Sequence, residues 1–285
     1  MKQLTIISGK GGTGKTTLAA ALASLAENCI MVDCDVDAPD LHIILNPKVK
    51  EKEVFTGSKF ATIDYSKCNE CGKCEEVCRF NAIKNLEIHS SKCEGCGLCS
   101  YICPEKAIAL ESRESGYLYA SETRFGPLIH AELNMGEGAS GKLVSFVRTI
   151  ATNLAENLHR DLIIIDGSPG IGCPVIASIT GIDMALIVTE PTISGFHDFY
   201  RILKVTRHFN VFSTLCINKY DINLENSEKI EEYGNKNNIP ILGKIPYDED
   251  IIDAMIERKN ILEYSPDGKA SAEIKKIWKR INYFI

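Results

Sequence analysis

The chain has 285 residues, of which 45% are hydrophobic and 25% are charged. This composition is typical of a folded protein and excludes a disordered chain or a fibre. The formal net charge of -6 excludes a general trap for nucleic acid, so we expect no nucleic-acid partner. No apolar run approaches the ~20 residues of a membrane helix, and the first residues do not resemble a signal peptide. We therefore expect a cytoplasmic protein that does not associate with membranes.

The beginning of the chain predicts a strand, a glycine-rich loop and a helix. Residues 4–8 are apolar and β-prone, residues 9–16 contain four glycines, and residues 17–27 are rich in alanine and leucine. A second short apolar strand, 30–32, runs into acidic residues. We expect ligands to bind where these strands end, because open α/β sheets bind ligands at the carboxyl ends of their strands.

Strands and helices continue to alternate in the second half of the chain. Further strands are predicted at 162–165, 185–188 and 215–217, and helices at 142–157 and 195–209. This alternation predicts an α/β fold with a mostly parallel sheet that helices cover on both faces.

A cysteine-rich segment interrupts this pattern. Eight of the twelve cysteines lie between Cys68 and Cys103, in a repeat with a period of 25 residues. In a reducing compartment such a dense cluster is typical of metal ligation rather than of disulfides. We predict an inserted domain at 58–111 within a discontinuous host domain, 1–57 and 112–285. The segment 116–130 predicts a hairpin that returns the chain to the sheet.

The glycine-rich loop 9–16 fits the P-loop pattern G-x4-G-K-[ST]. In such a loop the backbone amides surround phosphate oxygens, Lys15 reaches the outer phosphates, and the Thr16 hydroxyl can bind Mg²⁺. A chance glycine-rich turn is the alternative, but the predicted strand and helix on either side favour the nucleotide site. The expected nucleotide-binding residues of the loop are Gly11, Gly12, Thr13, Gly14, Lys15, Thr16 and Thr17.

The additional Lys10 resembles the deviant P-loop of the MinD, ParA and nitrogenase iron-protein superfamily. Residues 33–39 resemble its first switch and residues 166–170 its second. The resemblance implies an ATPase that works as a dimer, in which Lys10 crosses the interface to the partner's nucleotide. It also implies that Asp35 orients or activates the attacking water, or binds Mg²⁺, and that Asp166 holds Mg²⁺ through its shell.

Several neighbouring residues have two interpretations. Asp37 and Asp40 follow the first switch, where a solvated loop carboxylate is as well supported as a functional one. Residues 218–221 imitate the N-K-x-D guanine reader of GTPases, whereas the resemblance implies ATP with Asn218 as the adenine contact. We expect ATP. Residues 136–143 also fit G-x4-G-K, but they lack the hydroxyl and a preceding strand, which favours a helix-entry loop.

The two cysteine runs match the bacterial two-cluster ferredoxin arrangement, in which the fourth cysteine of each run binds the other cluster. The resemblance implies two 4Fe-4S clusters. Structural zinc, the alternative, prefers separated cysteine pairs. Arg79 stands where a proline often follows the fourth cysteine. The implied ligands are Cys68, Cys71, Cys74 and Cys103 for cluster one, and Cys78, Cys93, Cys96 and Cys99 for cluster two.

The remaining cysteines and the last helix have simpler interpretations. Cys173 resembles a cluster-bridging cysteine of the nitrogenase iron protein, but no second ligand is found between the cysteine runs and Gly172, so we predict a packed thiol. Membrane binding is one interpretation of the amphipathic helix 270–283. We predict that it docks on the host sheet instead. Cysteines at or beside predicted strands are expected to be core thiols: Cys29, Cys34 and Cys216.

Three classes of function compete. The first is an ATP-driven donor of electrons, through two 4Fe-4S clusters, to a partner metalloprotein. The second is a carrier that assembles or delivers an iron-sulfur cluster or metallocofactor, and the third is a positioning ATPase of the ParA kind. No C-x2-C pair occurs outside the cysteine repeat, which favours electron transfer. The expected partners are a second copy or a related ATPase, and a redox or maturation protein.

Overall fold

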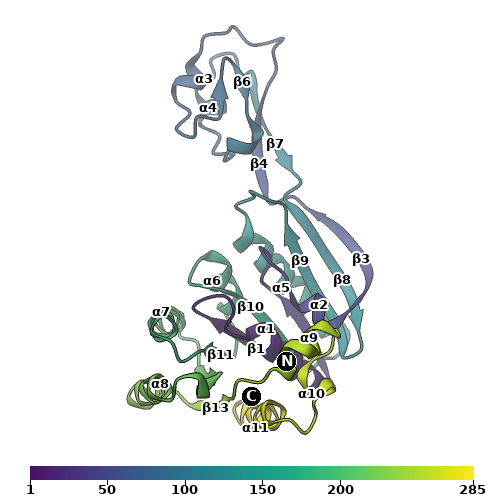
Figure 1. Ribbon diagram of the computed structural model, residues 1–285. Coiled ribbons are helices and arrows are strands. Elements are labelled where there is room, and N and C mark those ends of the chain that lie inside the picture. Colours follow the sequence, from purple (N-terminus) through teal and green to yellow (C-terminus); the bar gives the residue numbers. More distant parts are fainter. The chain divides into compact units, whose positions relative to one another are not determined.

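The computed structural model describes residues 1–285, which form two compact units (Figure 1). The first unit contains Met1–Lys52, Leu118–Glu132 and Ser140–Ile285. The second contains Glu53–Tyr117 and Leu133–Ala139. The segment 58–111, predicted as an insert, lies inside the second unit.

A nine-stranded sheet organises the first unit, and every pair from β13 to β9 is parallel. The prediction of a mostly parallel sheet is therefore confirmed. The hairpin predicted at 116–130 is also present, as β8 and β9 at one side of the sheet. The order is β13 (Ile241–Ile245), β12 (Ser213–Asn218), β11 (Met184–Thr189), β1 (Lys2–Ser8), β10 (Leu162–Pro169), β2 (Cys29–Asp33), β9 (Gly126–Leu133), β8 (Gly116–Thr123) and β3 (Lys48–Phe55).

Helices cover both faces of this sheet, because successive residues of a strand point to opposite faces. Leu4 and Ile6 of β1 pack in one cluster with residues of α1 and α11, whereas the Thr5 hydroxyl between them donates to the carbonyl of Ser178 in α6. The helices of this unit are α1 (Lys15–Leu25), α2 (Leu41–Leu45), α5 (Ser140–Asn157), α6 (Cys173–Ile179), α7 (Ile193–His208), α8 (Leu224–Lys236), α9 (Asp250–Ile256), α10 (Ile261–Tyr264) and α11 (Lys269–Phe284).

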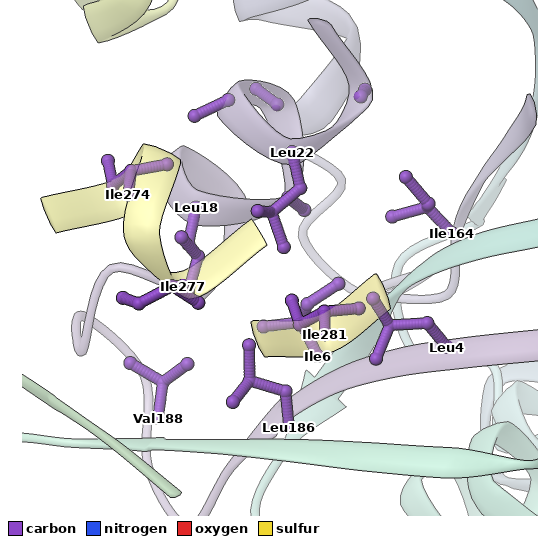
Figure 2. Packing of buried hydrophobic residues seen from close by; sticks show 14 of the residues in the cluster. Leu4, Ile6, Leu18, Leu22, Ile164, Leu186, Val188, Ile274, Ile277 and Ile281 are labelled. Atoms are coloured by element: carbon purple, nitrogen blue, oxygen red, sulfur yellow. The ribbon is translucent and has the colours of Figure 1, made fainter. Parts of the chain in front are cut away.

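The last helix, α11, belongs to the core of the first unit (Figure 2). Its residues Ile274, Ile277 and Ile281 are buried among side chains from α1, β1 and β11. The prediction that this helix docks on the sheet is confirmed. No helix in the structure has the length and apolar character of a membrane-spanning segment.

The second unit is small and contains all eight clustered cysteines. Its main element is an antiparallel pair, β4 (Ser58–Ile63) and β7 (Ile108–Arg113). Its core consists of Ala61, Ile83 and Ile108 together with Cys74, and further cysteines pack against them. The shorter elements are α3 (Lys73–Glu76), β5 (Ile83–Lys84), β6 (Glu87–Ile88) and α4 (Leu98–Ile102).

Candidate functional site

The P-loop connects β1 to α1, as predicted. Gly12 and Gly14 have positive φ values of 77° and 92°, which favour glycine. A side chain on Gly14 would also collide with the amide of Asn218. The loop is therefore shaped in part by Asn218, the last residue of a strand distant in the sequence, β12. The Lys15 side chain at the start of α1 is buried, and the buried Thr13 hydroxyl has no hydrogen-bond partner.

A cavity of about 600 Å³ lies at the carboxyl ends of the strands, beside this loop. An apolar wall contributed by Pro246, Ile251 and Met255 completes it, and sequence reasoning missed this wall because it comes from a loop and the short helix α9. The predicted residues that line the cavity are Gly11, Gly12, Gly14, Lys15, Thr16, Thr17, Asp35, Asp37, Asp40 and Asn218.

Three carboxylates, those of Asp33, Asp35 and Asp166, lie where segment 33–39 meets segment 166–170. These are the two segments that resemble switches. Burial raises the pKa of Asp35 to about 6, and the positive charge of Lys15 partly offsets this shift. Burial, and then the charge of Asp166, also raises the pKa of Asp33 well above its usual range. Asp33 accepts the backbone amides of Asp35 (2.9 Å) and Leu41 (3.1 Å), so it holds the first switch in place. This supporting role of Asp33 was not predicted.

Asp166 has the properties of a residue that acts on a bound cation. It is 1% exposed, and neither carboxylate oxygen has a hydrogen-bond partner. Burial raises its pKa, while Lys15 and the neighbouring Thr16 hydroxyl lower it. A carboxylate beside the P-loop hydroxyl fits Mg²⁺, which takes one or two carboxylates together with phosphate and water oxygens. Asp37 and Asp40, by contrast, are exposed loop carboxylates at the cavity rim.

Asn218 and its neighbours hold the P-loop from the side of β12. The Asn218 amide donates to the carbonyl of Thr13 at 2.8 Å, and its oxygen accepts the backbone amide of Lys219 at 3.0 Å. The carboxylate of Asp221 accepts the backbone amide of Tyr247 at 2.7 Å. Of the guanine-reader pattern, Asn218 and Lys219 line the cavity, whereas Asp221 is bonded to the chain itself.

Lys10 lies outside the cavity lining and contacts its own chain. Its ammonium group forms an ion pair with Glu190, with 2.5 Å between Nζ and Oε1, and donates to Ser194 Oγ at 3.2 Å. Sequence reasoning missed Glu190. Its place directly after β11, at the edge of the sheet that carries the P-loop, was the available signal.

The cysteines of the second unit divide between two cavities. Each cavity is lined by three cysteines of one run and the fourth cysteine of the other run. The two sets are those that the ferredoxin resemblance implies. One cavity is lined by Cys68, Cys71, Cys74 and Cys103, and the other by Cys78, Cys93, Cys96 and Cys99.

Backbone amides point at the sulfurs of both sets. The amides of Ala82 and Ala107 donate to Cys78 and Cys103, each at 3.3 Å and at equivalent places in the repeat. Such donors suit thiolates that bear negative charge. No group of three or more His, Cys, Asp or Glu side chains in the structure could hold a metal ion. A cubane differs from an isolated ion, because each of its four irons takes one cysteine.

The four cysteines outside the repeat have two kinds of environment. Cys29, Cys34 and Cys216 are fully buried, so the prediction of core thiols is confirmed. The prediction of a packed thiol at Cys173 is wrong, because this residue is exposed. It is the first residue of the short helix α6, where Val175 takes the buried position instead. Residues 136–143 lead into α5, which begins at Ser140, as expected of a helix-entry loop.

The parallel sheet, the glycine loop and the buried carboxylates define a P-loop nucleotide-binding protein. A family model described as the CobQ/CobB/MinD/ParA nucleotide binding domain matches residues 4–261. The chain belongs to this family, which agrees with the resemblance to MinD and ParA inferred from its motifs.

Other proteins are similar over nearly the whole chain. The uncharacterized protein MJ0578 of Methanocaldococcus jannaschii is 38% identical over 287 residues, which cover 99% of this chain and 97% of that protein. The cell division ATPase MinD of Pyrococcus furiosus matches with a TM-score of 0.62 at 18% identity, covering 100% of this chain and 99% of that one. MinD of Pyrococcus horikoshii, solved with Mg-ADP, gives 0.61 at 18% identity, covering 99% and 96%. These two structures share the fold.

Proposed function

We propose that this protein couples ATP binding and hydrolysis in a dimer to electron transfer through two 4Fe-4S clusters toward a partner metalloprotein. The observation that carries the proposal is the pair of four-cysteine cavities in a chain that also has a P-loop. The fourth cysteine of each run lines the cavity of the other run, which is the ligand exchange of two-cluster ferredoxins.

The nucleotide half of the proposal assigns roles to residues that line the 600 Å³ cavity and to two residues outside its lining, Lys10 and Asp166. Lys15 and the loop amides bind phosphates, and Thr16 and Asp166 hold Mg²⁺. Asp35 orients the attacking water. Lys10 stabilises the charge that develops on the neighbouring subunit's nucleotide. The subunits are two copies of this chain or one copy and a related ATPase.

The redox half is tested by metal analysis of anaerobically prepared protein. We expect ~8 iron and ~8 acid-labile sulfide per chain, the content of two cubanes. Cys103→Ala removes one ligand of cluster one and halves this content, whereas Cys173→Ala, at an exposed cysteine outside both cavities, leaves it unchanged. Stoichiometric zinc without sulfide, or a single cluster after reconstitution, contradicts the proposal.

The competing function is cluster delivery. Cys71 and Cys96, the second cysteine of each run, are exposed, so each cavity has an edge from which an acceptor can take a cluster as well as an electron. The two functions are separated by mixing the reduced, ATP-loaded protein with a cluster-free acceptor. Electron donation leaves the iron content of this protein constant, and delivery lowers it. The native acceptor is found by a pull-down under anaerobic conditions with ATP held unhydrolysed.

A further inference from the structure

The two cysteine cavities lie at different positions along β4. The cavity assigned to cluster one is lined by Ile63, the last residue of the strand. The cavity assigned to cluster two is lined by Ala61, nearer the start of the strand. A side chain on Gly95, which lines the same cavity, would collide with the carbonyl of Lys59, the second residue of β4. The cluster-two cavity is therefore the nearer one to the start of β4.

Arg113 connects the start of β4 to the second cysteine run. It is the last residue of β7 and lies opposite the first residue of β4. Its Nη1 donates to the carbonyl of Ser90 at 2.7 Å, in the turn that directly precedes Cys93. The equivalent turn of the first run, 25 residues earlier, precedes Cys68 and is bonded to the neighbouring Asp64 instead. Arg113 thus holds one of two equivalent turns.

A shielded carboxylate holds the other side of the Arg113 guanidinium. The Glu137 side chain is 8% exposed, and its Oε1 lies 2.9 Å from Arg113 Nε. Glu137 also accepts the hydroxyl of Ser58. Ser115 is fully buried, and its hydroxyl oxygen accepts the backbone amide of Ser58 at 3.1 Å. The Ser115 carbonyl in turn accepts the backbone amide of Asn134 at 2.9 Å. The segment that contains Glu137 is therefore bonded to the base of the β4–β7 pair at several points.

The same segment leads into α5, which packs beside the second switch-like segment. Glu137 lies three residues before the first residue of α5. A Cβ atom on Gly141, the second residue of the helix, would lie 3.0 Å from Cβ of Cys173. Cys173 begins α6 and follows segment 166–170 by three residues. A shift of segment 166–170 can thus reach Glu137 through α6 and α5, because closely packed elements move together.

We infer that Arg113 is a positioning residue that links segment 166–170, through α5 and Glu137, to the turn before Cys93. This inference rests on the proposed function, in which nucleotide and clusters act together. Since Arg113 bonds both Glu137 and Ser90, the turn before Cys93 follows any shift of Glu137. The turn before Cys68 is bonded within its own run. Bound nucleotide therefore alters the surroundings of the cluster-two cysteines and leaves those of cluster one as they were.

The inference is tested by hydrogen–deuterium exchange of the anaerobically prepared full chain, with and without Mg²⁺ and a non-hydrolysable ATP analogue. In the original chain the analogue is expected to slow exchange in residues 90–93 about fivefold, the low end of coupling between two sites. Exchange in the equivalent residues 65–68 should not change. Glu137→Gln should still bind the analogue but lose its effect on residues 90–93. The control is Asp64→Asn, which breaks an exposed pair in the same unit and should keep that effect.

Arg113→Lys is a second variant, because an ammonium group keeps the charge but cannot replace the planar fork that bonds Glu137 and Ser90 together. It should also lose the effect on residues 90–93. An effect that persists in both variants overturns the inference, and so does an equal effect, or none, at the two turns of the original chain. The iron and sulfide contents decide the proposed function separately. If the clusters are absent but both variants lose the effect, the proposed function fails and the role of Arg113 stands.

Discussion

The carboxylate of Asp221 is bonded to the backbone amide of Tyr247 at 2.7 Å, on the loop that follows β13. In a guanine reader this carboxylate accepts hydrogen bonds from the N1 and N2 donors of the base. Here it fixes a loop that lines the nucleotide cavity. The resemblance of residues 218–221 to N-K-x-D therefore has a structural explanation.

The first prediction concerns base selectivity. Asp221→Asn keeps an oxygen that accepts the Tyr247 amide, so we expect ATP to bind about as tightly as before and GTP to remain a poor competitor. In a guanine reader the same change replaces an acceptor by a donor and weakens GTP binding. Competition by ATP and GTP against a fluorescent nucleotide measures this. Preferential GTP binding that Asp221→Asn abolishes would contradict the ATP assignment.

The second prediction concerns Asp166, whose oxygens have no partner in the chain. In the proposed function Asp166 holds Mg²⁺ through its shell. If so, Asp166→Asn removes the charge that does this, and we expect the Mg²⁺ affinity or the hydrolysis rate to fall roughly 10- to 100-fold. The measurement is ATP hydrolysis as a function of Mg²⁺ concentration. Asp37→Asn, at an exposed carboxylate that lines the P-loop cavity, is the matched control. An unchanged Mg²⁺ dependence in Asp166→Asn excludes this role.

The third prediction concerns His130 in β9, which is 7% exposed. Its ring stacks on Tyr119 and His42, with centroid distances of 4.9 and 5.7 Å. Burial, with a smaller contribution from His42, lowers the pKa of His130 to about 4. As the pH falls below ~6.5, His130 therefore binds a proton in the unfolded chain before it does so in the folded chain. The contribution of neutral His130 to the free energy of unfolding is complete above that pH and is lost toward pH 4, by up to about 3 kcal/mol.

The measurement for His130 is the free energy of unfolding in urea between pH 4 and pH 8. His130→Phe keeps a stacking ring but cannot titrate, so its free energy of unfolding should vary less between pH 6.5 and pH 4 than that of the original chain. The same change at the exposed His208 should leave the pH dependence as it was. Parallel pH profiles for the original chain and His130→Phe would show that another group is responsible.

The fourth prediction concerns the contact of α11 with β13. A Cβ atom on Gly243 would lie 2.5 Å from Cγ1 of Ile277. Ile277→Ala is expected to lower the free energy of unfolding by about 2–5 kcal/mol, and Gly243→Ala is also destabilising because no space remains. In the double variant the new methyl group occupies part of the vacated space. The free energy of unfolding should therefore fall by less than the sum of the two single losses.

Urea unfolding of the two single variants and the double variant forms a complete cycle. Tyr283→Ala, on the exposed side of the same helix, controls for changes in helix propensity. Strictly additive losses would mean that Gly243 and Ile277 do not constrain each other.

The parts of the fold that sequence patterns predicted are those with strong local signals. The apolar strands that flank the P-loop are buried on both faces, so they appear as continuous apolar runs. Two strands of the nine-stranded sheet were missed. β3 (Lys48–Phe55) is an exposed edge strand with alternating charges, and β13 (Ile241–Ile245) is short and interrupted by Gly243. Neither has the apolar run that marks a central strand.

The candidate site divides in the same way. Lys15, Thr16 and Asp166 could be predicted because each belongs to a motif whose chemistry fixes the spacing. Glu190 was missed because its partner, Lys10, is 180 residues away in the chain. The exposure of Cys173 likewise depends on how α6 lies in the fold, which no local pattern records.

The antiparallel pairing of β4 and β7 has a consequence for how the cysteine-rich segment joins the rest of the chain. Ser58 lies directly opposite Arg113, so the cysteine-rich segment begins and ends at neighbouring points. A segment with adjacent ends can replace a short turn without stretching the surrounding chain, and the entropic cost of a longer loop grows only slowly with its length. A chain in which a short turn joins Ser58 directly to Arg113 would therefore span the same gap without the cysteines.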